Sequence, residues 1–153
     1  MNPEENHQVA YDLSRKVLDF LISQMKPGKS FKSIYASAQD FVQKVRPDFG
    51  QMFVRSVGYH TGLETHSTGA QINASNEDQV ESDSTFIVSA GFDASEMDES
   101  RRQQPWATWF AETVFVPADG SAQILTWNKC SQIEHIHECL VANLAHVTPF
   151  SGW

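Results

Sequence analysis

Residues 85–92 read Thr-Phe-Ile-Val-Ser-Ala-Gly-Phe, and this stretch decides the class of fold. Aromatic and β-branched residues, which favour strands, alternate with smaller ones along it. Successive side chains of a strand point to opposite faces, so one face carries Phe86, Val88, Ala90 and Phe92, and the other carries Ile87 and Ser89. The stretch therefore predicts a central strand with one apolar face that other elements must cover.

Two helices are predicted upstream of this strand. Apolar residues recur at helical spacing from Val9 to Met25, and Pro27-Gly28 follows as a strong stop signal. Ser30 is a suitable N-cap for a second helix, whose apolar stripe runs from residue 31 to residue 45. Helices joined by so short a connection are expected to pack as an antiparallel pair.

The remaining segments predict further strands and a last helix. Residues 52–57 and 69–73 are expected to be short strands, and the acidic stretches 75–84 and 93–105 are expected to be loops, the second one mobile. Residues 106–116 and 122–126 predict a hairpin, with its two tryptophans, Trp106 and Trp109, in the core. A capping-box pattern at residue 131 predicts a final helix over 131–146.

This order of elements predicts an α+β fold, with a curved antiparallel sheet covered by helices in a single domain over residues 1–153. The sequence shows no apolar run long enough to cross a membrane and no secretory signal at its start. Its two cysteines, Cys130 and Cys139, are too few for a disulfide framework, which favours a reducing compartment. The pattern His135-x-His137-x-Cys139 is not expected to bind a metal ion, because residues two apart on a helix face different ways.

Charge is distributed unevenly along the chain, whose formal net charge is -8. Residues 1–57 contain eight Lys and Arg against six Asp and Glu, whereas residues 58–153 contain three against thirteen. Such an acidic surface repels nucleic acid and attracts basic partners. The alternative is that the acidic residues only form a solvated face that keeps the protein in solution.

Three segments resemble the motifs of one enzyme family. GYHTGLETH (58–66) resembles GHGIG-x-x-x-H, FIVSAGF (86–92) resembles FTIEPGF, and AETV (111–114), with the turn and strand after it, resembles the EDTV hairpin. These motifs belong to the pita-bread (creatinase/aminopeptidase-like) metallopeptidases. The resemblance spans residues 8–127 and implies the second lobe of a pita-bread domain.

The resemblance also implies where the family's metal ligands would lie. The ligand His falls on Tyr59, and the two ligand Glu residues fall on Ser89 and Ala111. A site for two divalent ions needs several carboxylates and an imidazole, which Tyr, Ser and Ala do not supply. The family's two Asp ligands come from its first lobe, which this sequence does not contain. We therefore expect no metal, no other cofactor and no peptidase activity.

A shift of one residue is the main alternative to this alignment. His60 is adjacent to Tyr59, and Glu112 is adjacent to Ala111, so a divergent aminopeptidase or prolidase relative could use His60, Glu64 and Glu112. A one-residue shift turns a strand side chain to the opposite face, which weighs against this alternative. A purely structural half-domain that self-associates is a third alternative.

One branch of the family has lost its metal ligands in a similar way. In the N-terminal domain of the large subunit of the FACT histone chaperone, the segments read roughly as GFGxGIE, VIN, FSINLGF and GDTV. This sequence resembles that branch in Tyr59, in the pair Leu63-Glu64 and in Ala111, although His60 stands where a glycine is expected.

The branch implies a non-catalytic, protein-binding domain of a nuclear chromatin factor of the histone chaperone or transcription elongation type. The expected partners are histones or other basic peptides and further chromatin factors, with no strong binding of nucleic acid and none to membranes. A homodimer is also expected, because a lone lobe exposes the surface that normally meets the other lobe. The vestigial peptide-binding cleft is expected to lie at Tyr59, His60, Glu64, His66, Ser89, Ala111 and Glu112.

Overall fold

The computed structural model describes residues 3–61, 71–94 and 106–126. The helical elements are α1 (Pro3–Gln24), α2 (Phe31–Val45) and the short 3-10 helix η1 (Pro47–Met52). The strands are β1 (Ser56–Thr61), β2 (Gln71–Asn73), β3 (Ser84–Asp93), β4 (Ala107–Val116) and β5 (Gln123–Ile124). The described part of the chain has no helix that is both long and apolar enough to cross a lipid bilayer.

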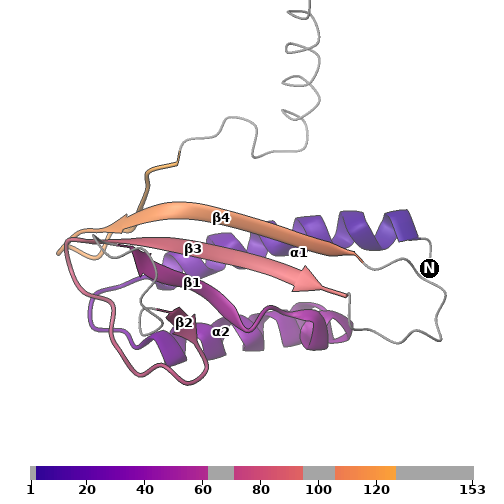
Figure 1. Ribbon diagram of the computed structural model, residues 1–153, viewed down its shortest axis with the longest axis horizontal. Helices are drawn as coiled ribbons and strands as arrows, with labels where there is room; N and C mark the ends of the chain where they lie inside the picture. Colours follow the sequence, from indigo (N-terminus) through magenta and orange to yellow (C-terminus); the bar gives the residue numbers. More distant parts are fainter. Residues whose placement is uncertain (1–2, 62–70, 95–105, 127–153) are drawn as a thin grey trace, which may run out of the picture.

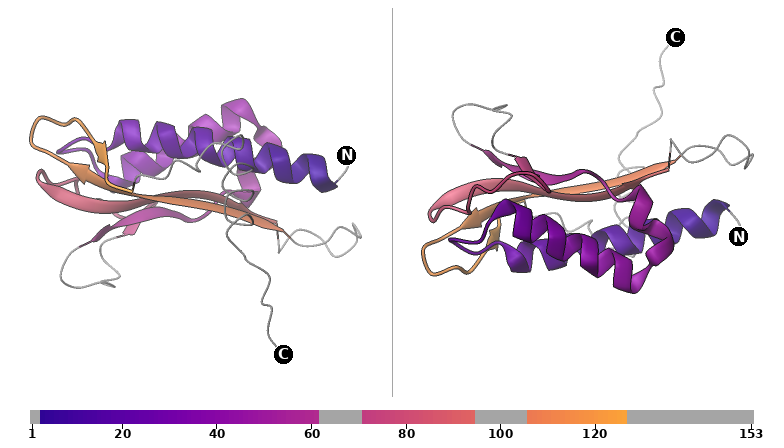
Figure 2. Two further views of the ribbon diagram at one scale, coloured as in Figure 1. Left: turned by 90° about the horizontal axis from the view of Figure 1, so that it is seen from above. Right: turned by 90° about the horizontal axis from the view of Figure 1, so that it is seen from below.

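The strands form one antiparallel sheet in the order β2-β1-β3-β4-β5, and α1 and α2 lie together on one of its faces (Figures 1 and 2). This is the α+β arrangement that the sequence predicts. β3 lies at the centre of the sheet, where it pairs with β1 on one side and along its full length with β4 on the other. The opposite face carries no helix among the described residues.

α1 ends and α2 begins where the stop signal and the N-cap predict, whereas α1 begins at Pro3, before the apolar pattern that starts at Val9. α1 ends at Gln24, and Gly28 follows with a φ of 81°, a conformation that glycine adopts without strain. α2 begins after Ser30, whose side-chain oxygen accepts a hydrogen bond from the Ser33 amide at 3.3 Å. Residues at helical spacing on both helices are fully buried, which confirms the predicted apolar stripes.

The core lies between these helices and the inner face of β3. Phe86, Val88, Ala90 and Phe92 are all buried there, as the alternation in residues 85–92 predicts. Phe86 meets Phe31 of α2 edge to face at 6.0 Å between ring centroids. At the other end of β3, Phe92 meets Phe49 of η1 at 5.4 Å. Buried aromatic pairs of this kind contribute about 1 kcal/mol beyond the burial of their area.

Two expectations about strands and tryptophans are wrong. β1 begins at Ser56 rather than at residue 52, because Pro47 starts a 3-10 helix that continues to Met52. Trp109 is 59% exposed rather than buried, since it lies on the face of β4 that points away from the helices. Trp106 does pack against the core, where its ring lies 6.1 Å from that of Phe49. The loop predicted over 93–105 begins later, because Asp93 still belongs to β3; residues 95–105 and the helix predicted over 131–146 lie outside the described residues.

Candidate functional site

The three predicted ligand positions lie on one face of the sheet. Tyr59 pairs with Ile87 across β1 and β3, and Ser89 pairs with Ala111 across β3 and β4. Directly opposite residues in antiparallel strands share a face, and Ile87 and Ser89 both alternate with the core residues of β3. Tyr59, Ser89 and Ala111 therefore lie on the face away from α1 and α2, which we call the open face.

Gly58 places Tyr59 on the open face. The pairing of β1 with β2 is irregular between Ser56 and Tyr59, and Gly58 has a φ of 137°. A Cβ atom at Gly58 would lie 2.1 Å from the carbonyl oxygen of Ile87. This irregularity leaves Val57 buried in the core and Tyr59 40% exposed on the other side of the sheet.

The open face offers poor metal ligands at these positions. Ser89 is 2% exposed between its neighbours, and the Ala111 methyl group has no donor atom. A phenol and a hydroxyl do not replace the carboxylates and imidazole that a two-metal centre uses, so the residues present do not fit the metals of a peptidase. Among the described residues, no group of three or more His, Cys, Asp or Glu is placed to hold a metal ion.

His60 and Glu112, the residues of the shifted alternative, point to the opposite side of the sheet. The His60 ring packs against Phe86, with 4.9 Å between ring centroids. Glu112 pairs with Val88 and forms an ion pair with Arg15 of α1 at 3.5 Å. The sheet therefore does not bring either residue to Tyr59 and Ser89. Glu64 and His66 lie outside the described residues.

Sequence reasoning missed a recess beside the open face. A pocket of about 560 Å³ lies between residues 51–56, Asp93 and the exposed ring of Trp109. The segment that forms one wall is held by Tyr35 of α2, whose hydroxyl donates a hydrogen bond to the Val54 carbonyl at 3.1 Å. Burial raises the pKa of Tyr35, which favours the neutral hydroxyl as that donor. The alternation of Trp109 with Phe110 along β4 is the signal that could have placed this tryptophan outside the core.

Comparison with curated proteins finds subunits of the FACT complex. The chain is 32% identical over 125 residues to the FACT complex subunit SPT16 of Arabidopsis thaliana, and the match covers 80% of this chain and 11% of that protein. It is 25% identical over 121 residues to the FACT complex subunit SPT16 of Saccharomyces cerevisiae, over 78% of this chain and 12% of that protein. The chain thus spans only about a tenth of these relatives.

Solved structures agree with this relationship. The N-terminal domain of FACT complex subunit SPT16 from Cicer arietinum superposes with a TM-score of 0.72 and 26% identity, over 83% of this chain and 30% of that one. Prolidase from Pyrococcus furiosus superposes with a TM-score of 0.65 and 19% identity, over 80% of this chain and 33% of that one. The superposition on the prolidase shows only that the two proteins share the pita-bread fold.

The sequence profile of metallopeptidase family M24 matches residues 1–137. This match covers all the residues that the structure describes, and the solved FACT domains share their fold. The resemblance to the pita-bread fold and to the N-terminal domain of a FACT subunit is therefore confirmed. The chain belongs to metallopeptidase family M24.

Proposed function

We propose that this chain is a non-catalytic, peptidase-like domain of a nuclear chromatin factor of the histone chaperone type, which binds histones or other basic peptides. The observation that carries the proposal is the set of side chains at the ligand positions on the open face: Tyr59, Ser89 and Ala111. Relatedness to FACT subunits supports the chromatin setting. The vestigial cleft at Tyr59, Ser89 and Ala111 would bind an extended peptide without cutting it.

Purified protein is expected to carry no stoichiometric divalent metal and to lack peptidase activity. The reason is that the open face supplies neither carboxylate nor imidazole at Tyr59, Ser89 and Ala111, and that His60 and Glu112 lie on the helix side. Elemental analysis after gel filtration, with cobalt or manganese supplied, measures this directly. One or two tightly held ions per chain would instead favour a divergent aminopeptidase or prolidase.

Binding to core histones is expected to be weak, to exceed binding to duplex DNA, and to weaken as salt concentration rises. The sequence after residue 57 has thirteen acidic against three basic residues, so its field attracts basic chains and repels phosphates. Parallel titrations of labelled histones and of duplex DNA at physiological salt test the proposal. Tighter binding to DNA would contradict it.

Self-association is a second candidate, favoured by the exposed aromatic side chains of the open face. Tyr59 is 40% exposed and Trp109 is 59% exposed, and exposed apolar surface of this kind is often covered by a partner. Light scattering coupled to gel filtration is expected to give twice the monomer mass of 17.2 kDa. A monomer peak that does not change with concentration would reject a homodimer.

A further inference from the structure

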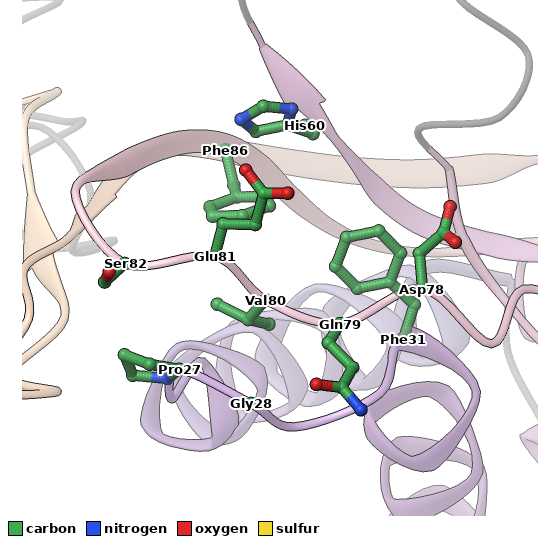
Figure 3. A pocket seen from close by; sticks show the side chains of 10 residues that line it. All are labelled: Pro27, Gly28, Phe31, His60, Asp78, Gln79, Val80, Glu81, Ser82 and Phe86. Carbon is green, nitrogen blue, oxygen red and sulfur yellow. The ribbon is translucent and has the colours of Figure 1, made fainter.

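A second recess lies on the helix side of the sheet, away from the open face. It is a pocket of about 710 Å³ beside the connection between α1 and α2. Its lining combines apolar side chains, including Phe31, Val80 and Phe86, with the carboxylates of Asp78 and Glu81 (Figure 3). His60 closes it at the end of β1, where its ring packs on Phe86. The lining exposes more polar than apolar surface, so the pocket suits a ligand that has both a polar and an apolar part.

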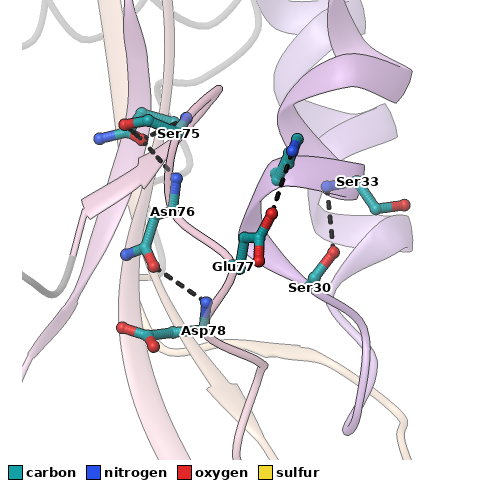
Figure 4. A network of polar contacts seen from close by, with 8 residues as sticks. Ser30, Ser33, Ser75, Asn76, Glu77 and Asp78 are labelled. Atoms are coloured by element: carbon teal, nitrogen blue, oxygen red, sulfur yellow. Dashed lines mark hydrogen bonds and ion pairs between the residues drawn. The ribbon is translucent and has the colours of Figure 1, made fainter.

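The wall that carries both carboxylates is held by backbone hydrogen bonds. The Gly28 amide donates to the Val80 carbonyl at 2.8 Å, and the Val80 amide donates to the Lys29 carbonyl at 2.9 Å. The Phe31 amide in turn donates to the Asp78 carbonyl at 2.8 Å. Side-chain bonds add to this ladder, since the Asn76 oxygen accepts from the Asp78 amide at 2.9 Å (Figure 4). A wall fixed in this way is preorganised and loses little entropy when a ligand binds.

The side chains that line the pocket carry negative charge, and the nearest lysines, Lys26, Lys29 and Lys32, belong to the adjoining segment but not to the lining. No Lys or Arg lines the pocket. Within the described residues, the ion pairs join Arg15 to Glu112, Lys32 to Glu77, and Arg46 to Asp48, so Asp78 and Glu81 take part in none of them. Two carboxylates in a recess that also has apolar side chains attract a cationic group.

We propose that this pocket binds a lysine or arginine side chain of a basic peptide. The aliphatic stem of such a side chain would lie against Pro27, Val80 and Phe86, and its cationic head would reach the carboxylates of Asp78 and Glu81. The inference rests on the proposed function, because it supplies a second contact for the same class of partner. It adds a site on the helix side of β1, whereas the vestigial cleft lies on the open face.

The probes are the tripeptide acetyl-Gly-Lys-Gly-amide and the same tripeptide with norleucine, which keeps the stem and lacks the charge. The full chain, labelled with ¹⁵N, is titrated with each probe and its amide shifts are followed by NMR. We expect the lysine probe to shift amides at Gly28, Val80 and Glu81, and the norleucine probe to bind about tenfold more weakly or not at all.

The double variant Asp78→Asn/Glu81→Gln is expected to weaken binding of the lysine probe about tenfold while retaining the wild-type amide spectrum elsewhere. The matched control is Glu77→Gln/Asp83→Asn, which removes the same charge from neighbouring positions that do not line the pocket. The control is expected to bind like the wild type. If both double variants bind the lysine probe equally weakly, the effect comes from the overall charge of the protein, and the inference is overturned.

The same variants separate this inference from the proposed function. If a histone tail peptide binds the wild type and loses affinity only with Asp78→Asn/Glu81→Gln, both proposals are supported. If the peptide binds both double variants equally and shifts amides around Tyr59, the pocket is not the site, although the proposed function stands. If no histone peptide binds while the lysine probe still shifts Val80 and Glu81, the proposed function fails and the pocket remains. An absence of shifts with the lysine probe, or equal shifts with the lysine and norleucine probes, overturns the inference.

Discussion

Replacing Gly58 with alanine is expected to lower the free energy of unfolding by about 3 kcal/mol or more, from backbone strain combined with overpacking. The φ of 137° at Gly58 is rarely adopted by residues with a side chain. The new Cβ would also lie 2.1 Å from the Ile87 carbonyl oxygen and 3.0 Å from the Val88 Cα atom, both of which belong to the backbone of the central strand. Urea denaturation followed by tryptophan fluorescence measures the loss.

Gly28→Ala is the matched control for this variant. Gly28 also has a positive φ, 81°, but a Cβ atom there would meet nothing within 4 Å. Its alanine variant therefore carries only the conformational penalty, about 1–2 kcal/mol. An equal loss in the two variants would show that the close approach of Gly58 to β3 does not add to the cost of the substitution.

Phe92→Ala is the second variant with a large expected effect, a loss of roughly 3–5 kcal/mol. Phe92 is completely buried and contacts Phe49 and Phe53, with ring centroids 5.4 and 5.7 Å away. Removing its ring leaves a cavity between η1 and the sheet that the surrounding backbone can only partly close. A marked fall in the midpoint of urea denaturation, without a change in slope, is the expected result.

Two further variants test the cause of that loss. Phe92→Leu keeps most of the volume and is expected to lose less than half as much stability as Phe92→Ala. Ile124→Ala removes apolar atoms from a side chain that is 50% exposed, and its effect is expected to stay within about 0.5 kcal/mol. If Phe92→Ala is as mild as Ile124→Ala, the end of the core near η1 is not tightly packed.

Periodicity predicted the parts of the fold in which every residue of an element follows one rule. The stripe of α2 and the alternation of β3 are of this kind, because burial of one face sets both patterns. The sequence did not predict the start of β1 at Ser56, since residues 52–55 have strand-like composition but continue from a 3-10 helix that starts at Pro47. It also placed Trp109 in the core, because composition alone does not say which face of a hairpin strand meets the helices.

The candidate site, too, has features that the sequence predicted and features that it did not. The motif spacing predicted that Tyr59, Ser89 and Ala111 occupy the ligand positions of one site. The register of β1, β3 and β4 brings them to a common face of the sheet. Which way His60 points depends on the irregularity at Gly58, which a residue count does not reveal. The pocket at Asp78 and Glu81 depends on backbone pairing between segments about fifty residues apart, and no local pattern marks it.

The backbone pairing between residues 28–32 and 76–80 has a consequence for local unfolding. Residues 28–32 and 76–80 belong to no helix or strand over most of their length, yet amides of each segment donate hydrogen bonds to carbonyl oxygens of the other. Surface connections usually exchange their amide hydrogens freely through small local fluctuations. Here the turn between α1 and α2 is bonded to the segment before β3, so we expect the amides of Gly28, Phe31 and Val80 to exchange together. The connection between the helices and the approach to the central strand thus form one cooperative unit, and any ligand that fills the space between them slows the opening of both.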